Sequence, residues 1–505
     1  MGATPTGAGP KAPITGVGNQ QGEGRSLGRD MGTGLAWSFL NNVIGRLGNF
    51  LAGIVVVRLL AQTEFGTYAI ALVVLSVILS MNELGVSVAI VHHRGNPAGI
   101  APTVMTLSLA ASGAFAALGF FAAPALAATL GAPEASGLIR LLLLGVLLDG
   151  VASVPNALMS RFFMQRRRLV IDTVAFCVAT PVTIGLALTG SGAWSLGWGA
   201  VAGNATTAVL ALAWSPVKAR LGWDRTIVKE LLTFGLPLSG ASLLLLLLLN
   251  VDNVIVSRSL GAAALGYYAL AFNLCSWPIT AVTSAIRRVA IALFARVTEH
   301  SDDGGSDGFG AALTVVTAVT LPMCILLAGY AGPLIGALYG PRWVPAAAAL
   351  VPLAVFSVIR VWVELAYDFL AGSGRSGRTV WLHAIWLVAL VPGMLLGARL
   401  NGIAGVGLAQ AAVAVLVAVP TLLWLMRGAG VRLHLGLRRL VPLCLGAAVM
   451  GGVVLGSRAV TEDPFVAMLV GSPVAVVLYL ACTWTLKSDA LSLWRLRAQP
   501  EPAIR

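Results

Sequence analysis

The sequence predicts an all-α integral membrane protein, and three observations support this fold class. Hydrophobic residues make up 58% of the 505 residues and charged residues only 10%, whereas soluble domains carry about 25% charged residues. The mean hydropathy is +0.88. The apolar residues also gather in runs of about 20, the length of one membrane-spanning helix. The chain therefore has no room for a sizeable soluble catalytic domain.

Fourteen apolar segments predict about fourteen transmembrane helices. Residues 1–34 precede them; they are rich in Gly, Pro, Thr and Ala without an apolar run, which predicts a disordered cytosolic tail rather than a signal peptide. Turn residues or charges separate the segments. The predicted helices span 35–58, 65–91, 101–127, 135–159, 169–189, 193–214, 231–257, 264–288, 309–330, 346–370, 379–398, 402–425, 438–457 and 464–486. A second cytosolic tail, 487–505, follows.

The basic residues indicate how the chain is oriented. With the N-terminus inside, most Lys and Arg fall in inward loops and tails. The outward loops hold only Arg58, Arg258, Arg342, Arg399 and Arg458. This bias predicts a multi-pass protein of the cell membrane with both termini in the cytosol. The net charge of +13 then reflects loop topology and anionic headgroups, and no aromatic-interleaved basic patch points to nucleic acid.

The chain also contains an internal repeat. Residues 54–72 align without a gap with 254–272, and the alignment pairs Arg58 with Arg258, Gly66 with Gly266 and Tyr68 with Tyr268. Each copy opens a block of six helices that starts on the same side of the membrane, so the repeats are parallel. The expected domains are an N-lobe (35–214), a cytosolic linker (215–230), a C-lobe (231–425) and an appended helix pair (426–486), with a central cavity between the lobes.

The run from Arg58 to Gly66 (Arg-Leu-Leu-Ala-Gln-Thr-Glu-Phe-Gly), followed by Tyr68, resembles the signature of a known family. The family comprises the polysaccharide exporters and lipid-linked oligosaccharide flippases of the multidrug/oligosaccharidyl-lipid/polysaccharide exporter superfamily. Supporting matches are Glu83-Leu-Gly85, where Asp is more usual first, Gly192-Ala-Trp194, Asp252-Asn253 and Arg287-Arg288. The resemblance covers about residues 35–425. It implies a two-lobed helical fold, a cavity between the lobes and alternating access.

Helix 1 carries an intramembrane arginine. Arg46 lies twelve residues before Arg58, which places it about 18 Å below the outer end of the helix, near the bilayer midplane. Asn42 and Asn49 share its helix face. The favoured interpretation is a cavity wall that binds the diphosphate or an acidic sugar of a lipid-linked oligosaccharide. The alternative is an arginine that ties helix 1 to backbone carbonyls of a neighbour.

Asp252 and Asn253 come late in helix 7, about 9 Å from its outer end. As part of the substrate cavity, they could coordinate a coupling cation or pair with a cavity arginine. The other interpretation is that Asp252 neutralises a neighbouring cation. Both remain open.

Two further sets of charges have two interpretations each. Arg360 and Glu364 lie one helical turn apart; they form either an intrahelical pair or a gate in which Arg360 meets Asp149 across the lobes. Arg287 and Arg288 at the cytosolic rim either receive anionic headgroups or obey the positive-inside rule. For the symmetric Arg58 and Arg258, with Gly66 and Gly266, a structural role in helix-end packing is favoured.

No sequence motif supports catalysis, a metal or a cofactor: HExxH, Walker A, GxSxG and CxxC patterns are missing. We therefore predict a transporter rather than an enzyme, a flippase for lipid-linked oligosaccharide, with undecaprenyl diphosphate as the carrier that the resemblance implies. Membrane lipids, and a polymerase and glycosyltransferases of the same pathway, are the expected partners. The alternative is a cation-coupled multidrug extruder, although helix 1 offers Arg46 where such extruders typically carry a carboxylate.

Overall fold

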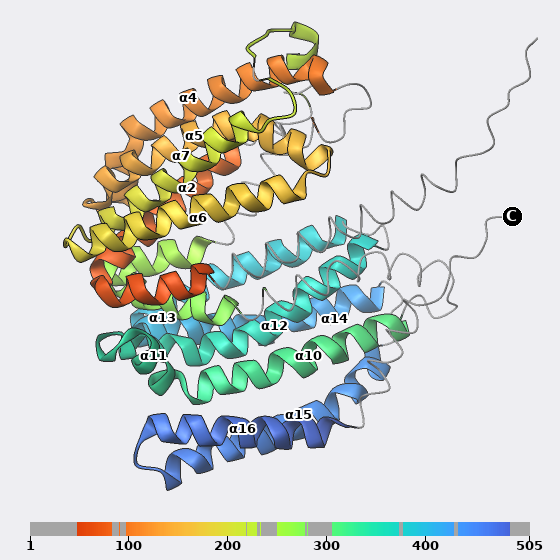
Figure 1. The fold of residues 1–505 in the computed structure, drawn as a ribbon. Coiled ribbons are helices and arrows are strands. Elements are labelled where there is room, and N and C mark those ends of the chain that lie inside the picture. The colour runs from red at the N-terminus through yellow and green to blue at the C-terminus, as the bar shows by residue number, and fades with distance from the viewer. Residues whose placement is uncertain are drawn as a thin grey trace, which may run out of the picture.

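The computed structural model shows two groups of roughly parallel helices, stacked one above the other in Figure 1. It describes residues 48–82, 90, 97–218, 220–229, 233, 250–277, 280, 306–372, 377–428 and 433–484, and none of these residues forms a strand. The first bundle comprises α2 (Gln62–Asn82), α4 (Pro97–Thr129), α5 (Ala135–Arg161), α6 (Gln165–Leu188) and α7 (Ala193–Ala213). A shorter helix, Gly48–Leu59, precedes α2.

The second bundle is built from α10 (Ser306–Gly329), α12 (Ala347–Gly372), α13 (Gly377–Val413) and α14 (Val419–Gly428). Short elements complete it: α11 (Ala331–Tyr339), the 3-10 helix η1 (Pro341–Ala346) and the π-helical η2 (Ala414–Ala418). Helical residues 250–260 and 262–277 also belong to the second bundle, and they contact the first. The last two helices, α15 (Leu433–Val460) and α16 (Pro464–Thr483), pack together at the outer side of α10 (Figure 1).

The predicted all-α membrane class is confirmed, because ten helical stretches of the described chain are long and apolar enough to cross a membrane. Several bounds agree closely; the predicted 135–159 is α5. The count of fourteen stays a prediction. One of the ten stretches, Ala384–Gly428, has 45 residues and turns at Asn401–Gly402, where the sequence separates two helices. The nine-residue α11 was not predicted, because it is too short to resemble a spanning helix.

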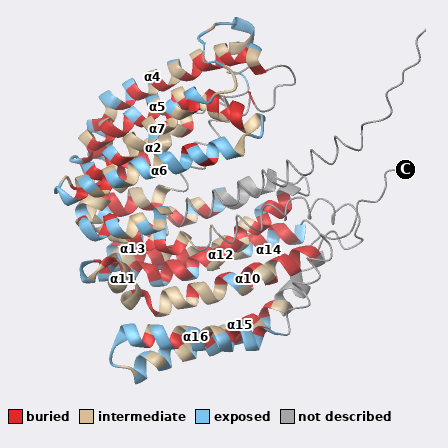
Figure 2. Ribbon diagram, viewed as in Figure 1, coloured by how far each residue is buried: buried red, intermediate tan, exposed pale blue. Residues whose placement is uncertain are grey.

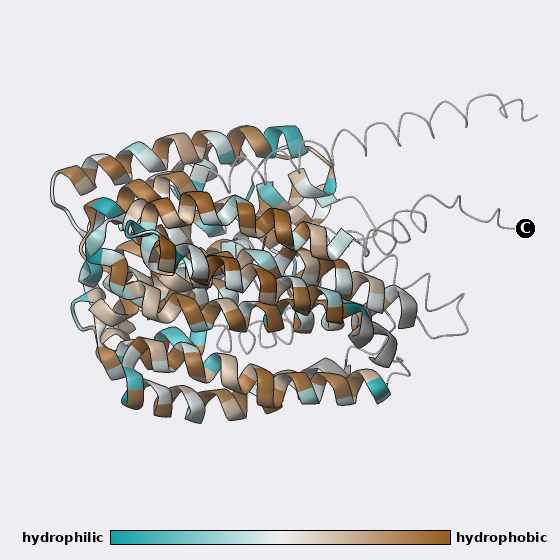
Figure 3. Cartoon of the chain, turned by 90° about the horizontal axis from the view of Figure 1, so that it is seen from below, coloured by the Kyte–Doolittle hydropathy of each residue, from teal (hydrophilic) through white to brown (hydrophobic). Residues whose placement is uncertain are grey.

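Burial follows the position of each helix (Figure 2). Helix α12 lies at the centre of the second bundle, and residues such as Leu350 and Leu353 are almost fully buried there. By contrast, α6 and α16 expose large apolar side chains. Figure 3 shows hydrophobic residues over most of the helical surface, with hydrophilic residues concentrated toward the helix ends. An outer surface of this kind is stable when it faces lipid rather than water.

Equivalent turns extend the internal repeat beyond residues 54–72. Gly192, between α6 and α7, has φ 55° and ψ −133°, and Gly402, at the turn within α13, has φ 52° and ψ −137°. Only glycine adopts this conformation readily. The helix contacts around the two turns also correspond: Gly199 packs against Thr183, and Ala409 against Gly393. This pairing supports the parallel six-helix repeat, while superposition of whole blocks stays a prediction.

The two bundles meet at one end of the molecule, which we call the junction. At its centre α2 crosses residues 262–277 through the repeat glycines: a Cβ on Gly66 would overlap the carbonyl oxygen of Ala262, and a Cβ on Gly266 would overlap that of Gln62. Since Ala262 and Gln62 are themselves repeat partners, the contact is reciprocal. This is the arrangement that a two-fold axis between Gly66 and Gly266 produces.

Hydrogen bonds surround this crossing. The Arg58 guanidinium donates to the carbonyls of Ala337 and Leu338, and the Trp343 indole donates to the Val57 carbonyl at 3.0 Å. On the other side of the crossing, the Ser257 hydroxyl donates to the Leu130 carbonyl. Both repeat copies therefore contact the opposite bundle, but the copy at residues 57–58 does so through more groups.

An arginine on the lipid side satisfies a backbone carbonyl of α4 that has lost its helical donor. Pro124 lacks an N–H, so the Phe120 carbonyl one turn earlier loses its helical partner. The Arg140 side chain from α5 donates to that carbonyl at 3.2 Å, and its guanidinium lies 4.8 Å from the Phe120 ring centroid. Proline is tolerated within a membrane helix when a neighbour satisfies the freed carbonyl in this way.

We expect Arg140→Met to lower the stability of the folded protein by about 1–3 kcal/mol, because the Phe120 carbonyl then has no donor in lipid. The same change in a Pro124→Ala background should cost less, since the alanine would supply the missing N–H. Thermal unfolding of the four purified proteins in detergent measures this coupling. Equal losses in both backgrounds would show that Arg140 acts through packing alone.

Candidate functional site

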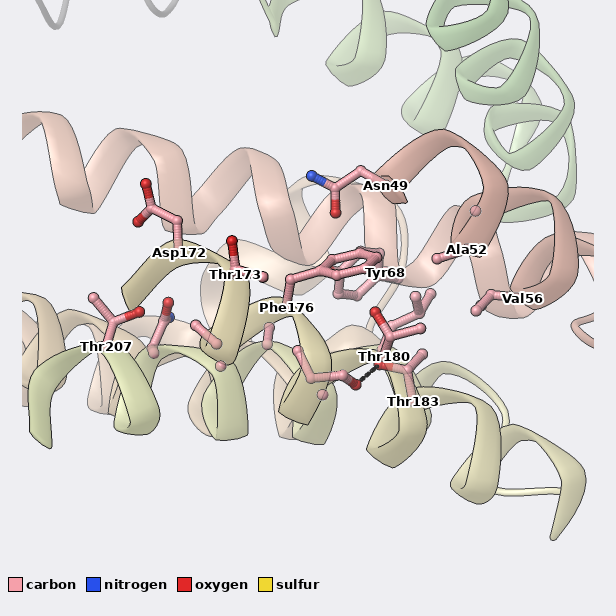
Figure 4. Close-up of a pocket in the computed structure, with 18 of the residues that line it drawn as sticks. Asn49, Ala52, Val56, Tyr68, Asp172, Thr173, Phe176, Thr180, Thr183 and Thr207 are labelled. Atoms are coloured by element: carbon pink, nitrogen blue, oxygen red, sulfur yellow. Dashed lines mark hydrogen bonds between the residues drawn. The ribbon is translucent and has the colours of Figure 1, made fainter. Parts of the chain in front are cut away.

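A cavity of about 870 Å³ lies within the first bundle, between the helix Gly48–Leu59, α2, α6 and α7 (Figure 4). Its volume falls in the usual range of ligand pockets, about 300–1,000 Å³. The lining residues are Asn49, Ala52, Gly53, Val56, Val57, Phe65, Tyr68, Gln165, Arg168, Asp172, Thr173, Ala175, Phe176, Ala179, Thr180, Thr183, Leu196, Gly199, Ala200, Gly203, Asn204 and Thr207.

Helix α6 supplies a hydroxyl-rich wall. Thr173, Phe176, Thr180 and Thr183 follow one another at spacings of three and four residues, so they share one helix face. Thr183 donates its hydroxyl to the Ala179 carbonyl of its own helix, shown by the dashed line in Figure 4. The neighbouring wall from α7 has little side-chain volume, because it consists of Gly199, Ala200 and Gly203. This lack of bulk leaves room for the cavity.

The opposite wall combines amide, aromatic and small side chains. Asn49 and Ala52 come from the helix Gly48–Leu59, and Phe65 and Tyr68 from α2. In Figure 4 the Asn49 side chain lies beside Phe176 and Tyr68. The Tyr68 hydroxyl makes no hydrogen bond within the described part of the chain. It is therefore a free donor at the edge of the cavity.

Charged residues line the cavity at the N-terminal end of α6. Arg168 and Asp172 both contribute to the lining, and Arg168 also donates to the Ser160 hydroxyl at 2.9 Å. One cation and one anion leave the described lining without net charge. Threonine, asparagine and aromatic side chains together offer hydrogen-bond donors, acceptors and flat apolar faces. Such a set suits a polyhydroxylated ligand, whose rim is polar and whose ring faces are apolar.

The residues predicted to line one cavity lie in different parts of the structure. Asn49 lines this cavity, whereas Arg46 and Asn42 lie outside the described residues. Asp252 is 4% exposed and lies in the second bundle, where it accepts hydrogen bonds from Tyr268 at 2.8 Å and Gln410 at 3.4 Å. Asn253 is half-buried next to it, and its backbone N–H donates to the Asp252 carboxylate at 2.8 Å. Neither residue lines the cavity between α6 and α7.

The predicted gate residues also have local partners. Arg360 and Glu364 form an ion pair of 3.1 Å along α12, and the Arg360 guanidinium lies 5.8 Å from the Phe272 ring centroid. The carboxylate of Asp149 accepts a hydrogen bond from Asn82 at 3.4 Å within the first bundle. A contact between Arg360 and Asp149 in another state stays a prediction. Arg287 and Arg288 lie outside the described residues.

The threonine face of α6 and the Tyr68 hydroxyl were not predicted as site residues, because threonine and tyrosine are common inside membrane helices and carry no charge. The signal was present, since threonines and Phe176 repeat with helical spacing while α7 carries glycine at positions 199 and 203. A polar helix face opposite a small one indicates space between two helices. Only the arrangement of the helices shows that these two faces meet.

Comparison with known proteins gives a family match. Residues 55–348 match the family described as "Polysaccharide biosynthesis protein". The succinoglycan biosynthesis transport protein ExoT of Rhizobium meliloti (strain 1021) is 28% identical over 370 residues, 72% of this chain and 74% of the relative. The lipopolysaccharide biosynthesis protein WzxC of Escherichia coli (strain K12) is 21% identical over 384 residues, 74% of this chain and 77% of the relative.

Solved structures share the fold at low sequence identity. The lipid II flippase MurJ, in an inward closed conformation, aligns with a TM-score of 0.72 at 12% identity and covers 90% of this chain and 99% of its own. An inward-facing multidrug resistance MATE family transporter of the MOP superfamily aligns with a TM-score of 0.61 at 17% identity, covering 78% and 98%. These alignments show that the chain shares the helical fold of MurJ and of the MATE transporter.

Proposed function

Because this chain belongs to the family of polysaccharide biosynthesis proteins, we propose that it moves a lipid-linked oligosaccharide across the cytoplasmic membrane by alternating access. The observation that carries this proposal is the cavity in the first bundle, whose threonine, amide and aromatic lining suits a glycan. The names of ExoT and WzxC, which place these relatives in polysaccharide biosynthesis, support the same substrate class.

The distribution of basic residues supports one orientation of the protein in the membrane. At the junction end lie Arg58, Arg258 and Arg342. At the other end of the first bundle, where α5 ends and α6 begins, Arg161 and the run Arg166–Arg168 lie together with few acidic residues. By the positive-inside rule the junction faces outward.

The residues outside the described part of the chain keep their expected roles in the proposal. Arg46 would engage the diphosphate of the carrier lipid, with Asn42 and Asn49 on the same helix face. Arg287 and Arg288 would receive anionic headgroups at the cytosolic rim. The lipid-linked glycan is then held at its sugar end by the cavity and at its phosphate end by helix 1. A polymerase and glycosyltransferases of the same pathway are the proposed partners.

A reconstitution tests the proposed function. We expect the full-length protein in liposomes to move lipid-linked oligosaccharide, extracted from its own host cells, between the two leaflets. An impermeant glycosidase added outside should then digest nearly all of the glycan, against about half in protein-free liposomes. Liposomes that carry heat-denatured protein serve as the matched control. Digestion that stops at half with the native protein would contradict the function.

A further inference from the structure

The second bundle contains a buried polar cluster whose members have repeat partners in the first bundle. Tyr268, which is fully buried, donates its hydroxyl to the Asp252 carboxylate at 2.8 Å. The Gln410 amide, 3% exposed, donates to the same carboxylate oxygen at 3.4 Å. Three helical segments therefore meet at this carboxylate: residues 250–260, residues 262–277 and α13.

The repeat identifies the corresponding residues of the first bundle. The alignment of residues 54–72 with 254–272, extended by two residues, pairs Ala52 with Asp252 and Tyr68 with Tyr268. Gly192 and Gly402 share one backbone conformation, and Ala200 and Gln410 each follow it by eight residues. Ala200 is therefore the partner of Gln410.

The two copies differ in one respect. Tyrosine is kept in both, but Ala52 and Ala200 stand in the first bundle where the second has Asp252 and Gln410. Ala52, Tyr68 and Ala200 all line the cavity. The neighbouring pair follows the same pattern, because Gly53 also lines the cavity and corresponds to Asn253. The cavity thus occupies the place that a carboxylate and two carboxamides fill in the other copy.

We propose that the cavity is the glycan subsite of the transporter, and that a sugar oxygen accepts the Tyr68 hydrogen bond that the Asp252 carboxylate accepts from Tyr268 in the other copy. This inference rests on the proposed function and names the group that recognises the glycan. The second bundle shows that the tyrosine in this fold position binds an oxygen acceptor. In the first bundle no described residue accepts this hydrogen bond, so the cavity leaves the acceptor position open for a ligand oxygen.

The rest of the lining fits a sugar better than a small ion. Thr173, Thr180 and Thr207 offer hydroxyls along the cavity, and each can both donate to and accept from a sugar hydroxyl. Phe65 and Phe176 offer apolar surface for the ring faces. A metal ion would need several carboxylates or carbonyls, and the described chain contains no group of three His, Cys, Asp or Glu side chains suited to a metal.

The decisive variant places at Ala52 the aspartate that its repeat partner, Asp252, has in the second bundle. We expect Ala52→Asp to lower transport at least about tenfold, because its carboxylate takes the Tyr68 hydrogen bond and the space of the sugar oxygen. Ala200→Gln should act in the same direction by filling the cavity from α7. Gly451→Ala in α15 is the control, since it lies outside the cavity lining and nothing lies within 4 Å of its Cβ position, so it should transport at the parent rate.

A stability measurement distinguishes two causes of lost transport: a carboxylate that takes the place of the sugar oxygen, and damage to the fold. Ala52→Asp should melt at the parent temperature or above it in detergent, as its carboxylate gains a donor. Tyr68→Phe should melt near the parent temperature on its own but lower the melting temperature when combined with Ala52→Asp. It should also reduce transport about tenfold on its own, since the sugar loses one hydrogen bond.

The outcomes distinguish the inference from the function on which it rests. If the parent protein moves no glycan in the reconstitution, the proposed function fails. If the parent is active and both Ala52→Asp and Ala200→Gln transport at its rate, the subsite is wrong while the function stands. Should Ala52→Asp fail to fold, Ala200→Gln and Tyr68→Phe decide the matter, and parent-level transport by both overturns the inference.

Discussion

Gly66→Ala is expected to open the junction and to abolish transport. The added methyl group would overlap the carbonyl oxygen of Ala262 and lie 3.0 Å from the Gly266 nitrogen. These are backbone atoms, which cannot rotate away as a side chain can, so α2 and residues 262–277 have to separate. Overpacking of this kind costs about 1–3 kcal/mol at one site. Adding Gly266→Ala should increase the loss, because that methyl group would overlap the Gln62 carbonyl oxygen.

Thiol labelling measures the opening. Ser257 is 2% exposed and donates to the Leu130 carbonyl across the junction. In a protein whose five cysteines are replaced by alanine, a Ser257→Cys variant should react slowly with an impermeant maleimide. Adding Gly66→Ala should accelerate labelling at least about tenfold. Gly451→Ala in α15 is the control, since nothing lies within 4 Å of its Cβ position. Parent-like labelling and transport in Gly66→Ala would contradict the packing role of the glycines.

The residues at this junction stood out in the sequence because the sequence repeats there. Arg58, Gly66, Arg258 and Gly266 stood out as a matched set, and the structure places Arg58 and both glycines in contacts between the bundles. The helices themselves were predictable from hydropathy, since a membrane span has to be long and apolar. Fixed spacing of unusual residues thus carried information about both the fold and its symmetry.

The cavity could not be predicted from intramembrane charge. Charged side chains were expected to mark the substrate path, yet Asp252 is enclosed within the second bundle and the described cavity is lined mainly by threonines and small residues. Arg140 was also missed, because its partner is a carbonyl freed by Pro124 in another helix. Such relationships depend on which helix faces meet, and hydropathy does not determine that.

The buried cluster leads to the second large expected effect, at Asp252. Asp252→Ala should destabilise the protein by about 2–6 kcal/mol, because the Tyr268 hydroxyl and the Gln410 amide would both lose their acceptor in a buried site, at about 1–3 kcal/mol each. The variant should therefore yield little folded protein. Thermal unfolding and the recovered amount of monodisperse protein measure this loss.

Asp252→Asn should fold. This variant keeps a hydrogen-bond acceptor at position 252 and removes the negative charge, so it tests the two contributions separately. The amide oxygen in the place of Oδ2 still accepts from Tyr268 and Gln410, and the new NH₂ group stands in the place of Oδ1, where the Asn253 backbone N–H is the described donor. We expect its stability to lie within about 1 kcal/mol of the parent and its transport to persist, because every described partner of Asp252 belongs to the second bundle. A folded Asp252→Asn protein that no longer transports would show instead that the carboxylate charge acts in transport, as coordination of a coupling cation requires.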